Sequence, residues 1–348
     1  MKTMLEVARR AGVSKATVSR VLNGTGQVKQ ATRDAVFQAM EELGYRPNFL
    51  ARSLARRTSN SIGLVISNFD GPYFGRLLRR ATDIAESNGK HLIVTDGHDT
   101  PEDEHRAVQL LSDRQCDAII LYTRYMSESD LMTLLDTLSI PMIVMNRDLP
   151  QARERCIFFR QQQAAFDVVN YLIEQGHREI ACITAPMQTP TARARLAGYQ
   201  QALIAHQIEV EPRRVAYGTS MVSSGYQAAR QLLNSGISFS ALFVSNDDMA
   251  IGAMKALYEA GKRLPQDVSV FGFDDEPCAT YLHPSLSTVY MPIEEMAATA
   301  ITQVLDLIAG KDVKPLQPFT GELKLRESVQ KGPYYAQQNY VPCKGSPL

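Results

Sequence analysis

From residue 61 onward, short apolar runs alternate with longer segments of helical pattern, and this alternation constrains the fold more than any other feature of the 348-residue chain. The apolar runs are residues 62–67, 91–95, 118–122, 142–146, 180–184, 215–217, 241–245 and 268–273. Such alternation predicts βαβ units, in which parallel strands form a sheet that helices cover on both faces. Eight runs are more than one ordinary open sheet holds, so we expect two parallel sheets and therefore two lobes.

The first 46 residues differ in texture and predict a small all-α domain of three short helices. Thr3 and Glu6 form a capping-box pattern before the first helix. Gly12 suits the left-handed backbone of a tight turn, Ser14 is a candidate N-cap of the second helix, and Gly44 ends the third. We expect the apolar face of the first helix to contain Leu5, Val7, Ala8 and Ala11.

The spacing of residues 8–22 is typical of a helix–turn–helix. Ala8 is a small residue where two helices would cross, Gly12 allows the turn, and Val13 is an apolar residue that would be buried behind it. The second helix then presents polar side chains at its N-terminal end, which is where a recognition helix meets base edges. A three-helix domain that merely carries a basic face is the alternative interpretation.

Charge separates along the chain in a way that the net charge of zero conceals. Residues 1–60 contain eleven Lys and Arg and four Asp and Glu, a net charge of +7, whereas the remaining 288 residues carry 26 basic and 33 acidic groups. A basic segment joined to an acidic remainder indicates contact with a nucleic acid or a membrane surface. In combination with the helix–turn–helix spacing, the basic segment favours DNA.

Several side chains of the predicted recognition helix suit contacts with DNA. Arg20 can bind guanine O6 and N7 through two hydrogen bonds, and Lys15 can reach a base edge or a phosphate. Taken singly, each such residue is more often a solvated surface residue, so the prediction depends on the whole pattern. The predicted DNA-binding residues of this domain are Thr3, Ser14, Lys15, Ala16, Thr17, Ser19, Arg20 and Asn23.

These motifs resemble the lac repressor/galactose repressor (LacI/GalR) family of bacterial transcription regulators. The resemblance covers about residues 3–330, and within the family it is greatest to regulators of β-glucoside or galactoside utilisation. The matching stretches are Leu5–Asn23, Gly44–Asn48, Ala51–Leu54, Gly176–Ile180, Arg193–Tyr199, Ser245–Gly252 and Gly272–Asp275.

The resemblance implies a mechanism for residues 47–60, which we expect to form a hinge helix and a linker. In such proteins the hinge helix forms only on operator DNA, and the two hinge helices of a dimer enter the minor groove. Asn48, Ala51 and Leu54 are the candidate contacts, and Leu54 would wedge into a central base step and kink the duplex. Packing of Leu54 against a partner helix is the alternative.

The resemblance also implies the fold class and the domain boundaries. We expect an all-α helix–turn–helix domain over residues 1–46, followed from residue 61 to 332 by an α/β body of the type I periplasmic-binding-protein fold. This body would have two Rossmann-like lobes, an N-lobe of about residues 61–160 and 292–322 and a C-lobe of about residues 161–291 and 323–332. Residues 333–348 are expected to be a flexible tail. Because this tail contains no leucine heptad, we expect a homodimer without a C-terminal tetramer-forming coil.

Ligands of open α/β sheets bind outside the carboxyl ends of the strands. The residues that this rule marks are Phe69, Asp70, Tyr73, Asn146, Arg147, Asn246, Asp247 and Asp274. Family position adds Arg160, Arg195, Ser220 and Met291 to the predicted effector-binding residues. Carboxylate, amide, guanidinium and aromatic groups together are the usual equipment for binding sugar hydroxyls. A single Asp or Arg at a strand end equally suits a cap or a turn.

The chain departs from the family pattern at three of these positions. Where the family often has an acidic residue there is Arg160, where it often has a tryptophan there is Ser220, and where the lac repressor has a glutamine there is Met291. These departures leave the particular sugar open, and Arg160 leaves room for an anionic effector such as a sugar phosphate.

Other functions find little support in the sequence. No nucleophile elbow, phosphate-binding loop or dinucleotide fingerprint is present, so we expect no enzyme and no cofactor. No apolar run reaches the ~18 residues of a membrane-spanning helix, and the first residues enter a helical pattern directly, so we expect a cytoplasmic protein without a signal peptide. Asp96, His98, Asp99, Glu102 and His105 are the densest group of possible metal ligands, but acids at a helix start favour the helix dipole, and we expect no metal.

The sequence therefore predicts a repressor of a carbohydrate-utilisation operon. A small sugar, glycoside or sugar phosphate in the cleft between the lobes would release it from a pseudo-palindromic operator. A periplasmic-type sugar-binding protein without DNA function, and a regulator that needs a non-sugar co-repressor, are the alternatives.

Overall fold

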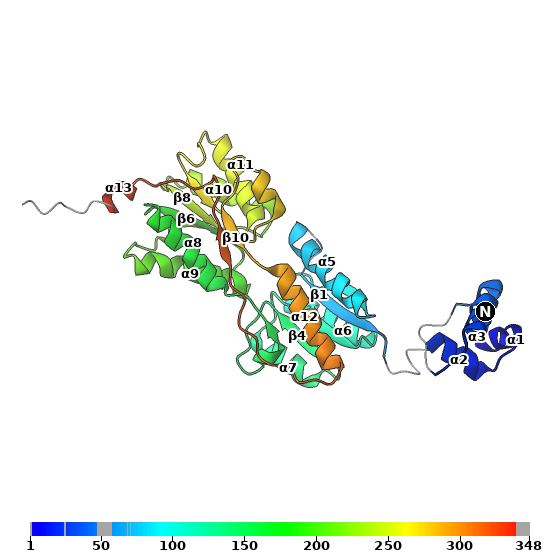
Figure 1. The fold of residues 1–348 in the computed structure, drawn as a ribbon. Coiled ribbons are helices and arrows are strands. Elements are labelled where there is room, and N and C mark those ends of the chain that lie inside the picture. Colours follow the sequence, from blue (N-terminus) through cyan, green and yellow to red (C-terminus); the bar gives the residue numbers. More distant parts are fainter. Residues whose placement is uncertain (1, 24–25, 47–57, 68, 70, 339–348) are drawn as a thin grey trace, which may run out of the picture. The chain divides into compact units, whose positions relative to one another are not determined.

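The structure is a computed structural model that describes residues 2–23, 26–46, 58–67, 69 and 71–338. The chain forms two compact units, Met1–Asn60 and Ser61–Leu348 (Figure 1). The predicted hinge contacts Asn48, Ala51 and Leu54 and the predicted ligand Asp70 lie outside the described residues.

The first unit contains three helices in its described part: α1 (Met4–Arg10), α2 (Lys15–Asn23) and α3 (Gln30–Leu43). The predicted capping box is confirmed, because the Thr3 hydroxyl accepts from the Glu6 N–H and the Glu6 carboxylate accepts from the Thr3 N–H. Gly12 and Gly44 both adopt positive φ, at 65° and 60°. The core of this unit consists of Val7, Ala8, Val18, Val21, Val36 and Ala39.

One detail of this unit was predicted wrongly. Leu5 is 48% exposed and does not share the buried face of Val7 and Ala8. An α-helix completes one turn every 3.6 residues, so a residue two positions before Val7 points to nearly the opposite side of the helix.

The second unit contains two parallel sheets, as predicted. The first has the strand order β2-β1-β3-β4-β5 within the described residues. Its strands are β1 (Ser61–Ile66), β2 (His91–Asp96), β3 (Ala118–Tyr122), β4 (Met142–Met145) and β5 (Cys156–Ile157). Helices α5 (Gly71–Ser87) and α12 (Ile293–Ile308) pack on one face, and α6 (Pro101–Asp113) and α7 (Glu128–Thr137) pack on the other.

The second sheet has the order β7-β6-β8-β9. Its strands are β6 (Ile180–Thr184), β7 (Val215–Tyr217), β8 (Ala241–Val244) and β9 (Ser269–Phe271). Helices α8 (Gln161–Glu174) and α9 (Pro190–Ala205) pack on one face, and α10 (Val222–Asn234) and α11 (Asp247–Glu259) pack on the other. Each sheet is the centre of one lobe of the unit, and Figure 1 shows the two lobes joined by several segments.

Three segments of the chain pass between the lobes side by side. Strands β10 (Thr288–Tyr290) and β11 (Glu322–Lys324) form an antiparallel pair, and Phe159 bridges to Phe319. The third crossover is the segment that contains Phe159 and Arg160. The Arg160 N–H donates to the Phe319 carbonyl at 2.9 Å, which connects this segment to the chain leading into β11. The strands β5, β10 and β11 were not predicted, because two or three residues are too few to show a periodicity.

The C-terminal segment is more ordered than predicted over its first residues. A short helix, α13 (Tyr335–Gln338), follows the last crossover, and the Tyr334 N–H donates to the Gly176 carbonyl at 3.0 Å. His177, next to it, is buried and its ring nitrogens bond to Ser240 Oγ and the Gln330 carbonyl. This end of the chain is therefore held against the second lobe by backbone hydrogen bonds of Gly332 and Tyr334.

Among the residues that the structure describes, no helix combines the length and the apolar character needed to cross a membrane. Within the same residues, no three His, Cys, Asp or Glu side chains converge as a metal-binding group. Cys116, Cys156 and Cys182 are free and buried, so they pack as small core residues.

Candidate functional site

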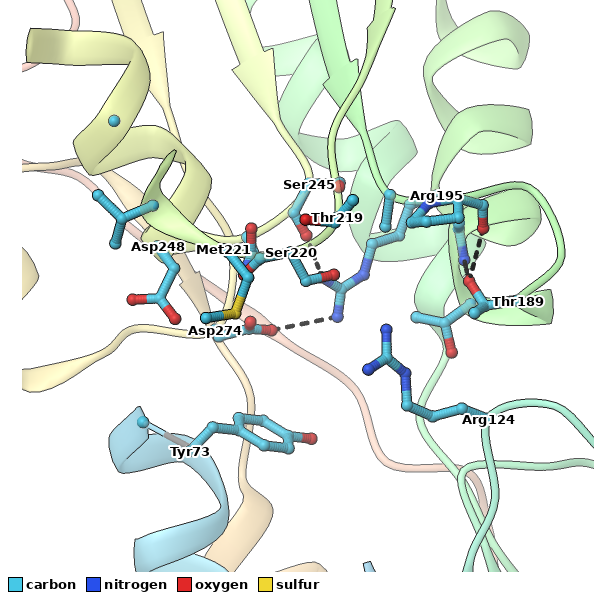
Figure 2. Close-up of a pocket in the computed structure, with 18 of the residues that line it drawn as sticks. Tyr73, Arg124, Thr189, Arg195, Thr219, Ser220, Met221, Ser245, Asp248 and Asp274 are labelled. Atoms are coloured by element: carbon cyan, nitrogen blue, oxygen red, sulfur yellow. Dashed lines mark hydrogen bonds and ion pairs between the residues drawn. The ribbon is translucent and has the colours of Figure 1, made fainter. Parts of the chain in front are cut away.

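A cavity of about 1120 Å³ lies between the two lobes of the second unit, and its walls come from the carboxyl ends of both sheets. Figure 2 shows side chains of both lobes pointing into it. In two-lobed α/β proteins the crevice at the carboxyl ends of parallel strands is where ligands bind. The segments that line it are residues 71–74, 99, 122–125, 146, 185–195, 219–227, 245–255 and 274–276, each in part.

Arg195 of α9 is the most constrained polar group of the cavity. Its side chain is buried, and its Nε donates to Gln161 Oε1 at 2.8 Å while Nη2 pairs with Asp274 Oδ1 at 3.1 Å. The Nη1 group donates to the Ser245 carbonyl, and the guanidinium lies 3.6 Å from the centre of the Phe273 ring. Arg195 is therefore fixed in place before any ligand binds, which lowers the entropy that binding would cost.

Asp274 follows β9 and holds an unusual backbone conformation. Its φ is 109°, and its N–H donates to the Val289 carbonyl at 2.9 Å. Burial raises the pKa of its carboxyl group, while the charge of Arg195 opposes that rise. Positive φ at a non-glycine residue concentrates at functional sites, where the surrounding structure enforces it.

Asp247, at the start of α11, holds the backbone of the loop that contains Asp274. It is completely buried, and its carboxylate accepts hydrogen bonds from the Phe273 N–H, the Glu276 N–H and the Thr288 hydroxyl at 2.7–2.8 Å. Burial raises its pKa well above the usual range. Asp247 thus shapes the loop that presents Asp274 and Glu276 to the cavity.

Three carboxylates form one part of the cavity wall, and we call Asp248, Asp274 and Glu276 the acidic cluster. Glu276 is only 4% exposed, and burial raises its pKa to about 7 although Arg76 lies beside it. Its Oε2 has no hydrogen-bond partner within the described residues. A buried acceptor without a partner is available to a ligand hydroxyl.

Asn146 connects the floor of the cavity to both lobes. It follows β4 at a φ of 66°, and its Nδ2 donates to the Thr123 carbonyl and to Thr191 Oγ1, each at 3.1 Å. Thr191 belongs to α9 of the other lobe. Because Gln161 Nε2 also reaches Asn146 Oδ1 at 3.5 Å, polar contacts run from Asn146 through Gln161 to Arg195.

An aromatic group forms the wall that belongs to the first lobe. The hydroxyls of Tyr73 and Tyr122 lie 3.0 Å apart, and Phe74 packs edge-on against both rings. Burial raises the pKa of Tyr73 well above its usual value, so its hydroxyl stays protonated. Aromatic faces with hydroxyl ends suit the mixed apolar and polar surface of a carbohydrate.

Six of the predicted effector-binding residues line the cavity. They are Tyr73, Asn146, Arg195, Ser220, Asn246 and Asp274. Asn246 is also the N-cap of α11, and its Nδ2 donates to the Ser220 carbonyl at 3.0 Å. This bond holds the loop after β7, where Ser220 adopts a φ of 67°.

Five other predicted residues that the structure describes do not line the cavity. Arg147 is buried and donates to the carbonyls of Arg124 and Met126, each at 3.2 Å. Asp247 supports a loop, as described above. Strand-end position alone could not distinguish these residues from cavity residues. A loop after a strand contains some side chains that hold its backbone and others that face the ligand.

Three more predictions are corrected in the same way. Phe69 is 55% exposed and lies outside the lining. Arg160 is exposed because it lies in a crossover segment, where its N–H pairs with Phe319 and its side chain points away from the core. Met291 is buried, and its sulfur lies 3.9 Å from the Tyr73 hydroxyl, beneath the aromatic wall.

Sequence reasoning missed several lining residues. Arg124 and Glu276 are the most significant of these, and Thr189, Asp248 and Ser245 also line the cavity. All of them follow strands of the predicted sheets, so the strand-end rule could have marked them. Family position could not do so for Arg124, which did not belong to any of the matching stretches.

The first unit presents several of the predicted DNA-contacting residues on its surface. Lys15, Ala16 and Arg20 are exposed on α2, whereas Val18 and Val21 are buried in the core behind them. Ser14 accepts from the Thr17 N–H at 3.1 Å, which is the predicted N-cap. The Arg10–Glu42 ion pair joins α1 to α3 and faces away from this core.

Two family models match the chain. "Bacterial regulatory proteins, lacI family" matches residues 3–48, and "Periplasmic binding protein-like domain" matches residues 169–329. The HTH-type transcriptional regulator AscG of Escherichia coli K12 is 46% identical over 331 residues, which is 94% of this chain and 98% of that protein. The HTH-type transcriptional regulator GalR of Salmonella typhimurium LT2 is 37% identical, over 94% of this chain and 96% of that protein.

Solved structures show the same likeness. A sugar-binding transcriptional regulator of the LacI family from Escherichia coli, complexed with phosphate, superposes with a TM-score of 0.73 at 40% identity, covering 79% of this chain and all of that one. The lac repressor dimer bound to operator and the anti-inducer ONPF gives a TM-score of 0.86 at 30% identity, over 94% of this chain and 99% of that one.

Proposed function

Because the chain belongs to the LacI family of bacterial regulatory proteins, we propose that it represses a carbohydrate-utilisation operon and that a small sugar or sugar derivative in the interlobe cavity releases it from DNA. The chain is a DNA-binding transcription regulator, and its relatives are regulators and not enzymes. DNA binding puts its site of action at the bacterial chromosome, in the cytoplasm.

The cavity carries the effector half of this proposal. A pocket of about 1120 Å³ is large enough for a mono- or disaccharide. It combines a fixed guanidinium on Arg195, the acidic cluster and the hydroxyls of Tyr73 and Tyr122. Such groups can accept from and donate to the several hydroxyls of a sugar at once, which distinguishes this cavity from an apolar ligand pocket.

The exposed N-terminal end of α2 carries the DNA half. Arg20 and Lys15 are free to meet a major groove, and the solved lac repressor binds its operator as a dimer. By analogy, two copies of this chain would place their recognition helices on the half-sites of a pseudo-palindrome. Phosphate contacts from the basic segment would make operator affinity fall steeply with salt.

The two halves are coupled only if the effector distinguishes two states of the regulator. A ligand shifts an equilibrium by no more than its difference in affinity for the two states. The cavity is bounded by both lobes, so a ligand that draws them together or holds them apart has such a difference. The proposed effector would therefore favour the arrangement that binds operator weakly.

One experiment tests the proposal directly. Full-length protein would be screened by thermal shift against sugars, glycosides and sugar phosphates, since a ligand of the folded state raises apparent stability. Operator fragments selected from random DNA would then be titrated with and without each hit. A hit that weakens operator binding supports the proposal, and a protein that binds no specific DNA contradicts it.

A further inference from the structure

Arg124 is the cationic group of the cavity that the structure leaves without a counter-charge. It follows β3 in the first lobe and lines the cavity. Its side chain forms no ion pair and donates no hydrogen bond within residues 58–67, 69 and 71–338, and its one contact of note is with the Tyr125 ring, 5.6 Å away. Arg195, by contrast, is neutralised by Asp274.

The backbone that carries Arg124 is clamped. Glu104 of α6 is completely buried, and its carboxylate accepts from the Thr123 hydroxyl and from the N–H groups of Arg124, Tyr125 and Met126 at 2.6–3.2 Å. Arg147 holds the carbonyls of Arg124 and Met126 from the other side. These contacts use only the main chain of Arg124, so its guanidinium extends freely from a rigid loop.

Two guanidinium groups converge in this part of the cavity. Figure 2 shows the ends of Arg124 and Arg195 pointing toward one another, with Thr189 on the same side. Thr189 caps α9, whose sixteen residues present their positive N-terminal end there. Arg195 is already paired with Asp274, so Arg124 supplies the uncompensated positive charge at this place. An anion between the two guanidinium groups would accept hydrogen bonds from both and would also be favoured by the helix N-terminus.

We propose that the effector is an anionic carbohydrate whose phosphate or carboxylate group binds between Arg124 and Arg195. The sugar hydroxyls then face the acidic cluster, where the buried Glu276 Oε2 has no partner in the described part of the chain. The cavity is thus polarised, with the cations at the β3 loop of the first lobe and at α9 of the second, and the carboxylates at the β8 and β9 loops. This inference rests on the proposed function, because it names the chemical class of the same effector.

The test uses the full-length protein and a matched panel of probes. The panel is inorganic phosphate together with glucose and galactose, each as the neutral sugar, the 6-phosphate and the uronate. Affinities would be measured by calorimetry for the wild type, Arg124→Gln, Arg124→Lys and Arg213→Gln. Arg213 is an exposed arginine outside the cavity, so its variant controls for loss of one positive charge.

We expect at least one anionic probe to bind the wild type about tenfold or more tightly than its neutral counterpart, because hydrogen bonds to charged groups are the strong ones. Arg124→Gln should remove most of that preference, Arg124→Lys should keep part of it, and Arg213→Gln should leave it unchanged. Preference for the 6-phosphate should also fall below about pH 6, where the phosphate takes up its second proton, whereas preference for the uronate should not.

The proposal is overturned if no anionic probe binds, or if Arg124→Gln binds anionic and neutral probes in the same ratio as the wild type. A neutral sugar that binds both proteins equally and weakens operator binding would leave the proposed function standing and remove this inference. Loss of specific DNA binding by the wild type would instead remove the proposed function itself.

Discussion

Arg76 of α5 and Glu276 of the loop after β9 form an ion pair of 3.1 Å that joins the two lobes beside the cavity. Only Arg76 Nη2 and Glu276 Oε1 take part in this ion pair. Arg76 Nε and Glu276 Oε2 have no hydrogen-bond partner among the described residues, although Arg76 Nη2 also approaches the Asp274 carbonyl at 3.4 Å. Glu276 thus contacts Arg76 of the opposite lobe and also lines the cavity. Protonation of its carboxylate would weaken the ion pair that joins the two lobes.

Stability should fall as pH rises from about 5 to 8, and Glu276→Gln should flatten that fall. Burial raises the pKa of Glu276 in the folded protein to about 7, above its unfolded value. A group with a raised folded pKa contributes stability that is fully present below the unfolded pKa and is lost as pH rises through the folded one. The loss across this window corresponds to about 2–3 kcal/mol.

Thermal denaturation of both proteins at half-unit pH intervals would measure this effect. A wild type whose pH dependence between 5 and 8 matches that of Glu276→Gln would show that Glu276 titrates normally.

Asp274→Asn should weaken effector binding about tenfold or more and leave operator affinity unchanged in the absence of effector. Asparagine tolerates the positive φ at this position, so the backbone should persist while the charge opposite Arg195 is lost. Asp275→Asn is the matched control, because Asp275 also has a positive φ but pairs with Arg326 outside the cavity. Calorimetric titration with the effector distinguishes the two, and equal effects of both variants would contradict the assigned role of Asp274.

Gly252→Ala should destabilise the protein by about 1–3 kcal/mol or more. Gly252 lies where α11 crosses α10, and an added Cβ would collide with the backbone at Val222 and Tyr226. The same crossing positions Ser220 and Asp248 on the cavity wall. Gly75→Ala in α5 is the control, because a Cβ there meets nothing within 4 Å and the change should be neutral or stabilising. Denaturant unfolding would compare them, and equal stability would contradict the close packing.

Arg20→Ala should weaken operator binding by about 1–3 kcal/mol and relax specificity at one base pair. Arg20 is exposed on α2, so its loss should not unfold the first unit. Fluorescence anisotropy against the selected operator and its single-base variants measures both effects, with Arg213→Gln as the charge control. Unchanged affinity together with unchanged specificity would exclude Arg20 as a base reader.

The sequence predicted the architecture well because the signals were local. All eight predicted strands are present, and the second sheet's last strand, expected over residues 268–273, forms at Ser269–Phe271. Gly12 and Gly44 adopt the backbone that their turn positions required. In each case a few neighbouring residues carry enough information.

The cavity was harder to predict because it depends on which side chains turn inward. Asp247 and Asp274 both follow strands, yet Asp247 is buried under a loop and Asp274 faces the cavity. Arg160 lies near the lobe junction but in an exposed crossover. Arg124 is a cavity residue only because Glu104, twenty residues earlier, clamps its backbone. Such outcomes follow from tertiary contacts that no local pattern encodes.

The central claim is that the interlobe cavity controls DNA binding. The most direct measurement is the operator Kd of full-length protein without effector and with effector at a concentration near its wild-type Kd, for the wild type and for Asp274→Asn at the same effector concentration. The account predicts that the effector raises the wild-type Kd and leaves that of Asp274→Asn nearly unchanged. By linkage, operator DNA should weaken effector binding to the wild type by the same factor. An operator Kd that the effector leaves unchanged or lowers in the wild type, or raises equally in both proteins, would contradict the claim.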